Sequence, residues 1–140
     1  MEIDPEVLVR SFPLGTVAEV ELVVADDNLA PGRGVFGTPN MVALMERAAS
    51  QLLAPLLPSG WSSVGTEVCI RHLAATPPGV TVKARAVLVS VEGRRLRFTV
   101  EASNPGRKIG EGTHERAVVE LHRFQQQAAR RSGGAEIPSS

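Results

Sequence analysis

Apolar residues recur at helical spacing between residues 38 and 54. The recurring positions are Met41, Leu44, Met45, Ala48 and Leu52. Side chains three or four positions apart lie on one face of a helix, so this pattern predicts an amphipathic helix with one buried face. Thr38 is the predicted N-cap, because its hydroxyl can accept from a free N–H of the first turn. Pro39 suits the first helical position, and Pro55 predicts the end.

Glu46 interrupts this apolar pattern. Its neighbours on the helix surface are Val42, Ala49, Ser50 and Leu53, most of them apolar. A carboxylate in such a place needs a partner, a raised pKa or a cavity in front of it. The alternative is a glutamate at the margin of the apolar face that reaches solvent or pairs with an arginine. The spacing by itself leaves both interpretations open.

Alternating apolar and polar residues predict five strands around this helix. They cover residues 16–24, 63–73, 80–91, 94–103 and 108–124. In the second strand, period two places His72 on the apolar face with Val68 and Ile70, and Gly65 and Cys69 on the opposite face. In the last strand, His114 and Arg116 share a face with Val118, and residues 92–93 form the turn of a hairpin.

One long helix followed by antiparallel strands predicts an α+β fold in which the sheet wraps the helix. We expect a single domain over residues 1–124 and a disordered tail over residues 125–140, which has little to bury. An open sheet leaves an unpaired edge strand, and pairing with a second copy is a common way to cover it. The sequence therefore also predicts a homodimer.

Composition limits the classes of partner. The 140 residues carry a formal net charge of +0 and 4% aromatic side chains, which argues against a general nucleic-acid or membrane surface. No apolar run approaches the ~20 residues of a membrane helix, and the acidic start at residues 1–5 is not a secretory signal. Cys69 is the only cysteine, which fits a reducing compartment. These features predict a cytoplasmic protein.

Three reactive side chains are candidates for a shared site. Thr38 lies at the helix start, Glu46 two turns further on, and His72 on the apolar strand face. If they converge, a carboxylate and an imidazole would share a site with a helix N-terminus, whose N–H groups stabilise a developing oxyanion. Taken singly, Thr38 is more often only a cap and His72 a core histidine. Histidines 114 and 122 lack metal-ligand spacing, so no metal is predicted.

Several separate motifs resemble the fluoroacetyl-CoA thioesterase family. They are GTP at residues 37–39, LME at 44–46, VGTEVCIRH at 64–72, AATPPG at 74–79, SVEGRRL at 90–96 and GEGTHERAV at 110–118. Members of this family have the hot-dog fold, in which an antiparallel sheet of about five strands wraps one long helix, and they are usually dimeric. The resemblance covers residues 35–124.

This resemblance implies the roles of particular residues. The family's catalytic threonine, glutamate and histidine correspond to Thr38, Glu46 and His72. Four positions are implied to bind substrate: Phe36, Gly37, Gly65 and Arg116. The implied reaction is hydrolysis of a small or medium acyl-CoA thioester with no cofactor, since coenzyme A is part of the substrate. Glu46 would act as nucleophile or base, and these two roles stay open.

One segment departs from the family pattern. The family's lid before the helix is longer and carries aromatic side chains, whereas residues 25–34 are short and only Phe36 is aromatic nearby. Because lids control access and specificity, we expect an acyl preference broader than or different from fluoroacetyl. Two other functions remain open. They are a hot-dog hydratase-dehydratase acting on acyl thioesters and a non-catalytic acyl-CoA-binding module.

Overall fold

A computed structural model describes residues 2–130, 133–134 and 136–138. Its elements in chain order are α1 (Pro5–Arg10), β1 (Val17–Val23), η1 (Asp26–Asn28), α2 (Thr38–Leu53), η2 (Ala54–Leu56), β2 (Trp61–His72), β3 (Thr81–Glu92), β4 (Arg95–Asn104), β5 (Arg107–Glu120) and α3 (Leu121–Arg130). The expected α+β architecture of one long helix and five antiparallel strands is confirmed.

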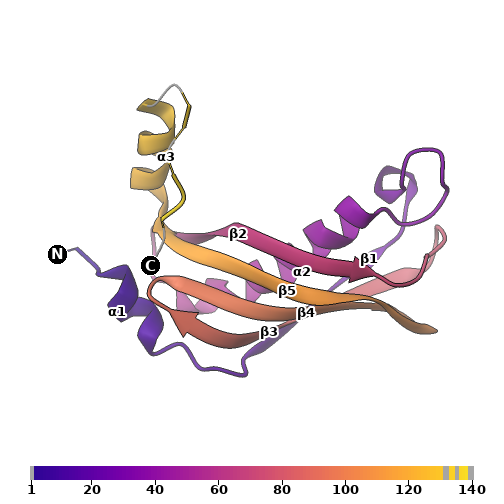
Figure 1. Cartoon of the computed structure of the whole chain (residues 1–140), viewed down its shortest axis with the longest axis horizontal. Helices are drawn as coiled ribbons and strands as arrows, with labels where there is room; N and C mark the ends of the chain where they lie inside the picture. Colours follow the sequence, from indigo (N-terminus) through magenta and orange to yellow (C-terminus); the bar gives the residue numbers. More distant parts are fainter. Residues whose placement is uncertain (1, 131–132, 135, 139–140) are drawn as a thin grey trace.

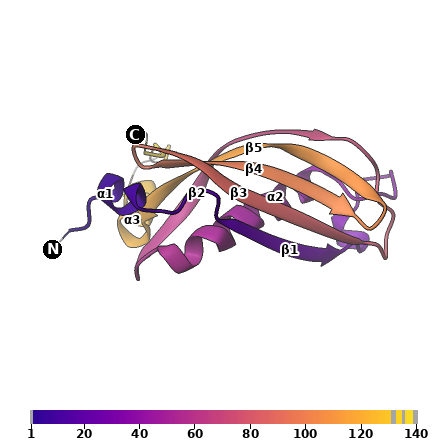
Figure 2. The same cartoon turned by 90° about the horizontal axis from the view of Figure 1, so that it is seen from below.

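The sheet has the strand order β1-β3-β4-β5-β2, and every neighbouring pair is antiparallel. It curves across α2, and α1 and α3 lie together at one end of it (Figures 1 and 2). Strands β1 and β2 form the two edges of the sheet. One side of β2 is therefore without a neighbouring strand among the described residues.

Helix α2 supplies one wall of the core. Its buried residues are Met41, Leu44, Met45, Ala48, Ala49, Leu52 and Leu53, which include all five positions of the predicted apolar face. They pack against buried side chains of the sheet such as Val82, Leu88 and Phe98. Burial of a large apolar side chain contributes about 1.5–3 kcal/mol, so this contact fixes the helix against the sheet.

The predicted N-cap of α2 is wrong by one residue. Gly37 is the N-cap, Thr38 is the first helical residue, and Pro39 follows it in the first turn. The first intrahelical hydrogen bond runs from the N–H of Met41 to the carbonyl of Gly37, 3.0 Å. Because no side-chain hydrogen bond caps this end, the hydroxyl of Thr38 remains free for a tertiary contact.

A β-bulge in β2 changes which side chains face the helix. The register with β5 shifts between Gly65 and Glu67, so Thr66 is an extra residue. Strict alternation predicted Gly65 and His72 on opposite faces, and that prediction is wrong. Gly65 pairs with Arg116 and Val68 with His114. Since directly paired residues point to the same side of a sheet, the bulge brings Gly65 and His72 to the helix side.

The ends of the chain contain two helices that the sequence interpretation did not include. Asp4 caps α1 through a hydrogen bond to the N–H of Glu6, and Pro5 follows at the first position. The last strand ends at Glu120 rather than residue 124, and α3 continues through Arg130 where the tail was expected to lack structure. None of the ten α3 residues, all of them described, is buried.

Candidate functional site

Thr38 and His72 form a direct pair. Thr38 begins α2 and His72 ends β2, and their Oγ1 and Nδ1 atoms are 2.8 Å apart. Either group donates, depending on the imidazole tautomer. The other ring nitrogen of His72, Nε2, is buried without a hydrogen-bond partner in the described part of the chain. The pair thus combines a hydroxyl, an imidazole and the first turn of a helix.

A wide groove of about 610 Å³ opens beside this pair. Its lining comprises Ala30, Arg33, Val35, Phe36, Thr38, His72, Leu73, Ala74 and Ala75. Most of these side chains are small or apolar, and Arg33 is the charged exception. Phe36 is only 1% exposed. The groove offers an apolar wall to a ligand group that reaches the Thr38 hydroxyl.

Glu46 belongs to a second group of side chains. Its Oε2 lies 3.4 Å from Nη1 of Arg116 and 3.9 Å from Nε2 of His114. The Glu46 side chain is 39% exposed, whereas that of Arg116 is 9% exposed. The sequence left two interpretations open: a carboxylate that needs a partner, a raised pKa or a cavity, and a glutamate at the margin of the apolar face that reaches solvent or pairs with an arginine. In the structure the carboxylate pairs with Arg116 and remains partly exposed to solvent.

Gly65 makes room for this carboxylate. A Cβ at residue 65 would overlap Oε2 of Glu46 and would lie 3.5 Å from Nη1 of Arg116. Any larger side chain would therefore displace Glu46 from its position. Three of the predicted residues, Glu46, Gly65 and Arg116, are thus brought together from α2, β2 and β5.

Arg116 is fixed by contacts on three sides. Its Nε donates to Oγ of Ser63 at 2.8 Å, and its Nη2 donates to the Ser63 carbonyl at 3.0 Å. Its Nη1 contacts both Glu46 and His114. Burial lowers the pKa of Arg116 from its ordinary value, and the charge of Glu46 opposes this effect. The guanidinium therefore offers a rigid positive charge to Glu46.

The predicted catalytic residues do not all meet within one copy of the chain. Thr38 pairs with His72, and Glu46 pairs with Arg116. Glu46 lies eight positions after Thr38 on α2, which corresponds to about 12 Å along the axis of a helix. The two groups therefore form separate halves of the predicted constellation.

Gly37 has a structural task in addition to its predicted contact with substrate. Its N–H donates to the carbonyl of Asn28 at 2.9 Å. A Cβ at this position would lie 2.5 Å from Oδ1 of Asn40. Gly37 thus holds the start of α2 tightly against the preceding loop, which positions Thr38.

The loop before α2 is compact. The N–H of Ala30 donates to the carbonyl of Val35 at 2.8 Å, and the N–H of Arg33 donates to that of Ala30 at 3.0 Å. An isolated β-bridge joins Leu29 to Phe36. Within the loop, Gly32 and Gly34 take positive φ values of 69° and 68°, which only glycine adopts readily. The short loop therefore folds on itself beside the groove.

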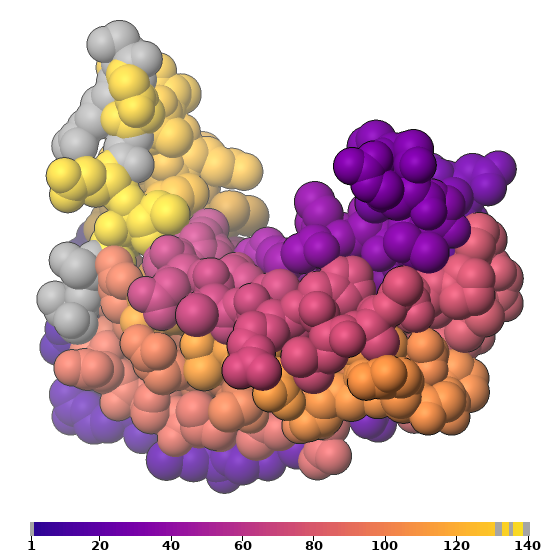
Figure 3. Space-filling view, turned by 45° about the vertical axis from the view of Figure 1, so that its right-hand side comes forward, coloured from indigo at the N-terminus to yellow at the C-terminus, as the bar shows by residue number. Residues whose placement is uncertain are grey.

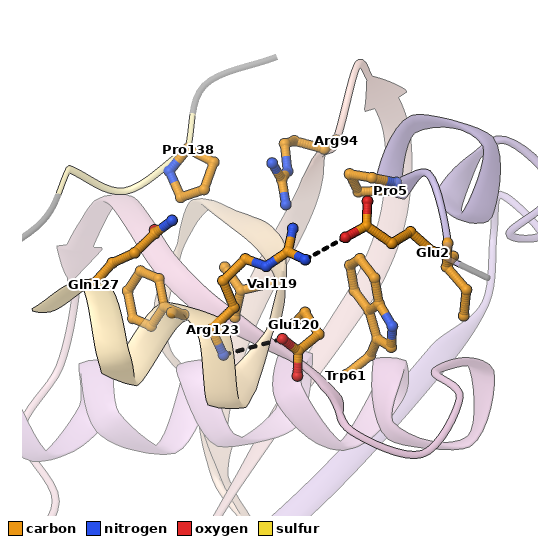
Figure 4. A pocket seen from close by; sticks show the side chains of 11 residues that line it. Glu2, Pro5, Trp61, Arg94, Val119, Glu120, Arg123, Gln127 and Pro138 are labelled. Atoms are coloured by element: carbon orange, nitrogen blue, oxygen red, sulfur yellow. Dashed lines mark hydrogen bonds and ion pairs between the residues drawn. The ribbon is translucent and has the colours of Figure 1, made fainter.

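A further cavity of about 430 Å³ lies between α1 and α3 (Figure 4). Trp61, Arg94 and Arg123 line it together with Glu2 and Glu120. Arg123 is paired with Glu2. The two carboxylates balance the two guanidinium groups, so the lining favours neither an anion nor a cation. Among the described residues, no cluster of three or more His, Cys, Asp and Glu side chains could hold a metal.

Two residues near Glu46 were not identified as site residues from the sequence. Ser63 contacts Arg116 through both its hydroxyl and its carbonyl, and only the bulge turns it toward the helix. One feature of the sequence could have indicated His114, because alternation in the last strand placed it on the same face as Arg116. Its contacts to Arg116 and Glu67 depend on strand pairing that the sequence does not reveal.

Comparisons with known proteins identify the family of this chain. A family described as fluoroacetyl-CoA-specific thioesterase matches residues 17–122. A fluoroacetyl-CoA thioesterase from Streptantibioticus cattleyicolor is 53% identical over 90 residues, which are 64% of this chain and 65% of that protein. The match thus spans just under two thirds of the length of that relative.

Solved structures show the same fold. A mutant of the fluoroacetyl-CoA-specific thioesterase, in complex with fluoroacetate and CoA, is 42% identical with a TM-score of 0.77, covering 81% of this chain and 99% of that one. A hot-dog-like protein from Thermanaerovibrio acidaminovorans is 26% identical with a TM-score of 0.81, covering 95% and 100%.

The fold and these relatives define a hot-dog protein of the thioesterase class. More narrowly, the chain belongs to the fluoroacetyl-CoA-specific thioesterase family. The resemblance noted in the motifs and the predicted hot-dog fold are both confirmed. Of the helices in the described ranges, none is long and apolar enough to cross a membrane.

Proposed function

We propose that this protein hydrolyses acyl-CoA thioesters to the free acid and CoA. The observation that carries the proposal is the Glu46 carboxylate, which Arg116 holds at 3.4 Å in the space left by Gly65. A half-exposed carboxylate in a fixed position can attack a carbonyl or activate water. Membership of the thioesterase family supports the same chemistry.

We propose that two copies of the chain build each active site. Within the described part of the chain no strand pairs with one side of β2, and this side of the molecule is hollowed between α3 and the segment before α2 (Figure 3). Antiparallel pairing of two β2 strands about an axis through Cys69, with Thr66 left out of the pairing as it is against β5, would place Gly65 of one copy opposite His72 of the other. Cys69 at this axis and the neighbouring Val68 are both exposed. The homodimer would thereby join the Glu46 half to the Thr38–His72 half.

The proposed mechanism uses the two halves on opposite sides of the thioester. Glu46 either takes a proton from the attacking water or attacks the carbonyl carbon itself, giving an anhydride that water then cleaves. The hydroxyl of Thr38 and the first turn of α2 would stabilise the oxyanion. When the carbon–sulfur bond breaks, His72 would transfer a proton to the CoA thiolate. The products are then the free acid and the CoA thiol.

The groove next to Thr38 supports a small or medium acyl group. Its walls are alanine, valine, leucine and phenylalanine side chains. The relatives are named for fluoroacetyl-CoA, and a compact loop in place of a long lid favours an acyl preference here that is broader than or different from fluoroacetyl. We propose no cofactor besides the CoA of the substrate and no nucleic-acid or membrane partner. A cytoplasmic location fits the single free cysteine, Cys69.

The test is thiol release from short, branched and aryl acyl-CoA esters by the wild type and Glu46→Gln. Gln keeps the shape of the side chain and removes its charge. We expect a loss of about 100-fold or more in kcat on the best ester. Arg47→Gln is the matched control, because Arg47 is the next residue of the helix and is exposed.

The other outcomes either refute the role of Glu46 or identify a different function. Equal rates for the wild type and Glu46→Gln would refute the assigned role of Glu46. Water addition to enoyl-CoA without thiol release would identify a hydratase. Saturable CoA-ester binding without turnover would identify a binding module. Label found in the Glu46 carboxylate after a single turnover in ¹⁸O-water would identify Glu46 as the nucleophile, because water that cleaves an anhydride at the Glu46 carbonyl leaves its oxygen there, whereas general-base catalysis does not.

A further inference from the structure

His114 is a buried histidine that the proposed chemistry does not use. It is 1% exposed, and its ring lies 6.0 Å from that of Phe98, centroid to centroid. Burying an imidazole is costly unless both ring nitrogens find partners. The partners of these two nitrogens therefore indicate what the residue does.

Those partners select one state of the ring. Nδ1 lies 2.8 Å from the carbonyl oxygen of Glu67, and a carbonyl can only accept, so Nδ1 carries the proton. Nε2 lies 3.2 Å from Nη1 of Arg116, and a guanidinium can only donate, so Nε2 presents its lone pair. Both contacts are satisfied by the neutral ring with its proton on Nδ1. Burial and the charge of Arg116 lower the pKa of His114, which favours the same neutral state.

The contact with Arg116 determines where that guanidinium points. The hydroxyl and the carbonyl of Ser63 accept from Nε and Nη2 of Arg116. The two hydrogens of Nη1 are therefore left for other acceptors. One is directed to Nε2 of His114 and the other to Oε2 of Glu46, 3.4 Å away. Without an acceptor at Nε2, the Nη1 group would lose one of its two fixed directions and the buried guanidinium one of its partners.

We propose that His114 is a positioning residue that aims Arg116 at the Glu46 carboxylate through a hydrogen bond accepted by its neutral ring. The kinetic consequence rests on the proposed thioesterase function, whereas the hydrogen bond itself does not. A histidine that only fills the core would affect stability and activity in parallel. A positioning residue changes kcat beyond any change in stability.

Two variants separate the two nitrogens of the ring. In His114→Gln, the amide oxygen reaches the place of Nε2 and can accept from Arg116. In His114→Asn, the shorter amide reaches only the place of Nδ1, where it can donate to Glu67. We expect His114→Gln to keep kcat within about threefold and His114→Asn to lose about 10- to 100-fold in kcat with a similar KM, as misplacement of a catalytic group does. Melting temperatures of both variants are measured alongside.

Equal kcat values for the two variants, or losses that follow their melting temperatures, would overturn the proposal. A measurement on the wild type covers the case in which a variant does not fold. The ¹⁵N chemical shifts of His114 should show a neutral ring protonated at Nδ1, and a proton on Nε2 would refute the hydrogen bond to Arg116. If the wild type cleaves no thioester, the proposed function fails while this measurement still decides the state of His114.

Discussion

Thr38 and His72 are joined by a 2.8 Å contact between Oγ1 and Nδ1, across the space between the first turn of α2 and the last residue of β2. This contact is possible because Gly37, rather than Thr38, caps the helix. A threonine engaged as a cap would direct its hydroxyl to the backbone of its own helix. The glycine thus frees the hydroxyl for an imidazole and for a substrate.

Replacement of Thr38 by alanine should therefore reduce activity and leave stability nearly unchanged. We expect kcat to fall about 100-fold or more, because an oxyanion contact and the partner of His72 are both lost. Loss of a true N-cap costs ~1 kcal/mol, whereas we expect a change within ~0.5 kcal/mol here. Urea denaturation and steady-state kinetics measure the two effects. Thr38→Ser restores a hydroxyl and should recover much of kcat, and a failure to do so would argue against this role.

Gly65→Ala should displace Glu46 without disturbing the fold. The added methyl group would overlap Oε2 of Glu46, and the backbone of Gly65 does not have a positive φ. We expect kcat to fall by at least about tenfold, as for a misplaced catalytic group. The measurement is thiol release together with a melting curve. Activity equal to wild type would show that the position of Glu46 is not needed.

Gly112→Ala is the matched control on the neighbouring strand. A Cβ at Gly112 would overlap the carbonyl oxygen of Cys69, and a backbone atom cannot move aside as a flexible side chain can. We expect a loss of about 1–3 kcal/mol in the free energy of unfolding. In this variant, kcat per folded molecule should change less than in Gly65→Ala. The opposite order of effects on kcat would contradict the assignment of Gly65 to the site.

The stability of the protein should depend on pH through His114. Burial lowers the folded-state pKa of His114 below its unfolded value near ~6.5. Between these two pKa values the unfolded chain binds the extra proton. This contribution to stability is therefore complete above ~6.5 and is lost as pH falls toward the folded pKa.

Melting temperatures of the wild type and His114→Gln from pH 8 to pH 5 measure this contribution. Their difference should change in favour of the variant as the pH falls below ~6.5. The charged groups around the ring are Arg116, Glu46 and Glu115, and all three remain in the variant. Parallel pH profiles for the two proteins would show that the ring does not titrate differently in the folded state.

A mixture of two inactive variants tests the shared active site. Glu46→Gln and Thr38→Ala remove opposite halves of the proposed site. Random exchange of subunits makes half of the dimers mixed, and each mixed dimer contains one intact site. We expect about one quarter of wild-type activity after mixing and refolding. No recovery, with mixed dimers shown by mass spectrometry, would place all three residues in one copy.

Truncation after Phe124 tests the proposed domain boundary. It removes residues 125–140, and none of the α3 residues is buried. We expect the melting temperature to change by only a few degrees, as for loss of exposed surface contacts, and thioesterase activity to persist. Loss of the cooperative unfolding transition would show that the domain extends into residues 125–140.

Local patterns predicted much of this fold because they reflect physics that acts within a few residues. The apolar face of α2 and the face shared by His114, Arg116 and Val118 on β5 both follow from side-chain periodicity. The Asp4-Pro5-Glu6 sequence that begins α1 carried a usable capping signal as well. The pairing of Glu46 with an arginine was one of two interpretations that the sequence allowed.

Local patterns thus predicted the central helix and the number of strands, and the motifs indicated the family and the candidate residues. How those residues meet follows from contacts between distant parts of the chain. The bulge at Thr66 turns Gly65 and Ser63 toward the helix, and strand pairing brings Arg116 and His114 to Glu46. Periodicity describes one strand at a time, whereas a bulge and its register depend on the partner strand. Contacts between residues 70 positions apart, such as Glu46 and Arg116, exist only after those strands have paired.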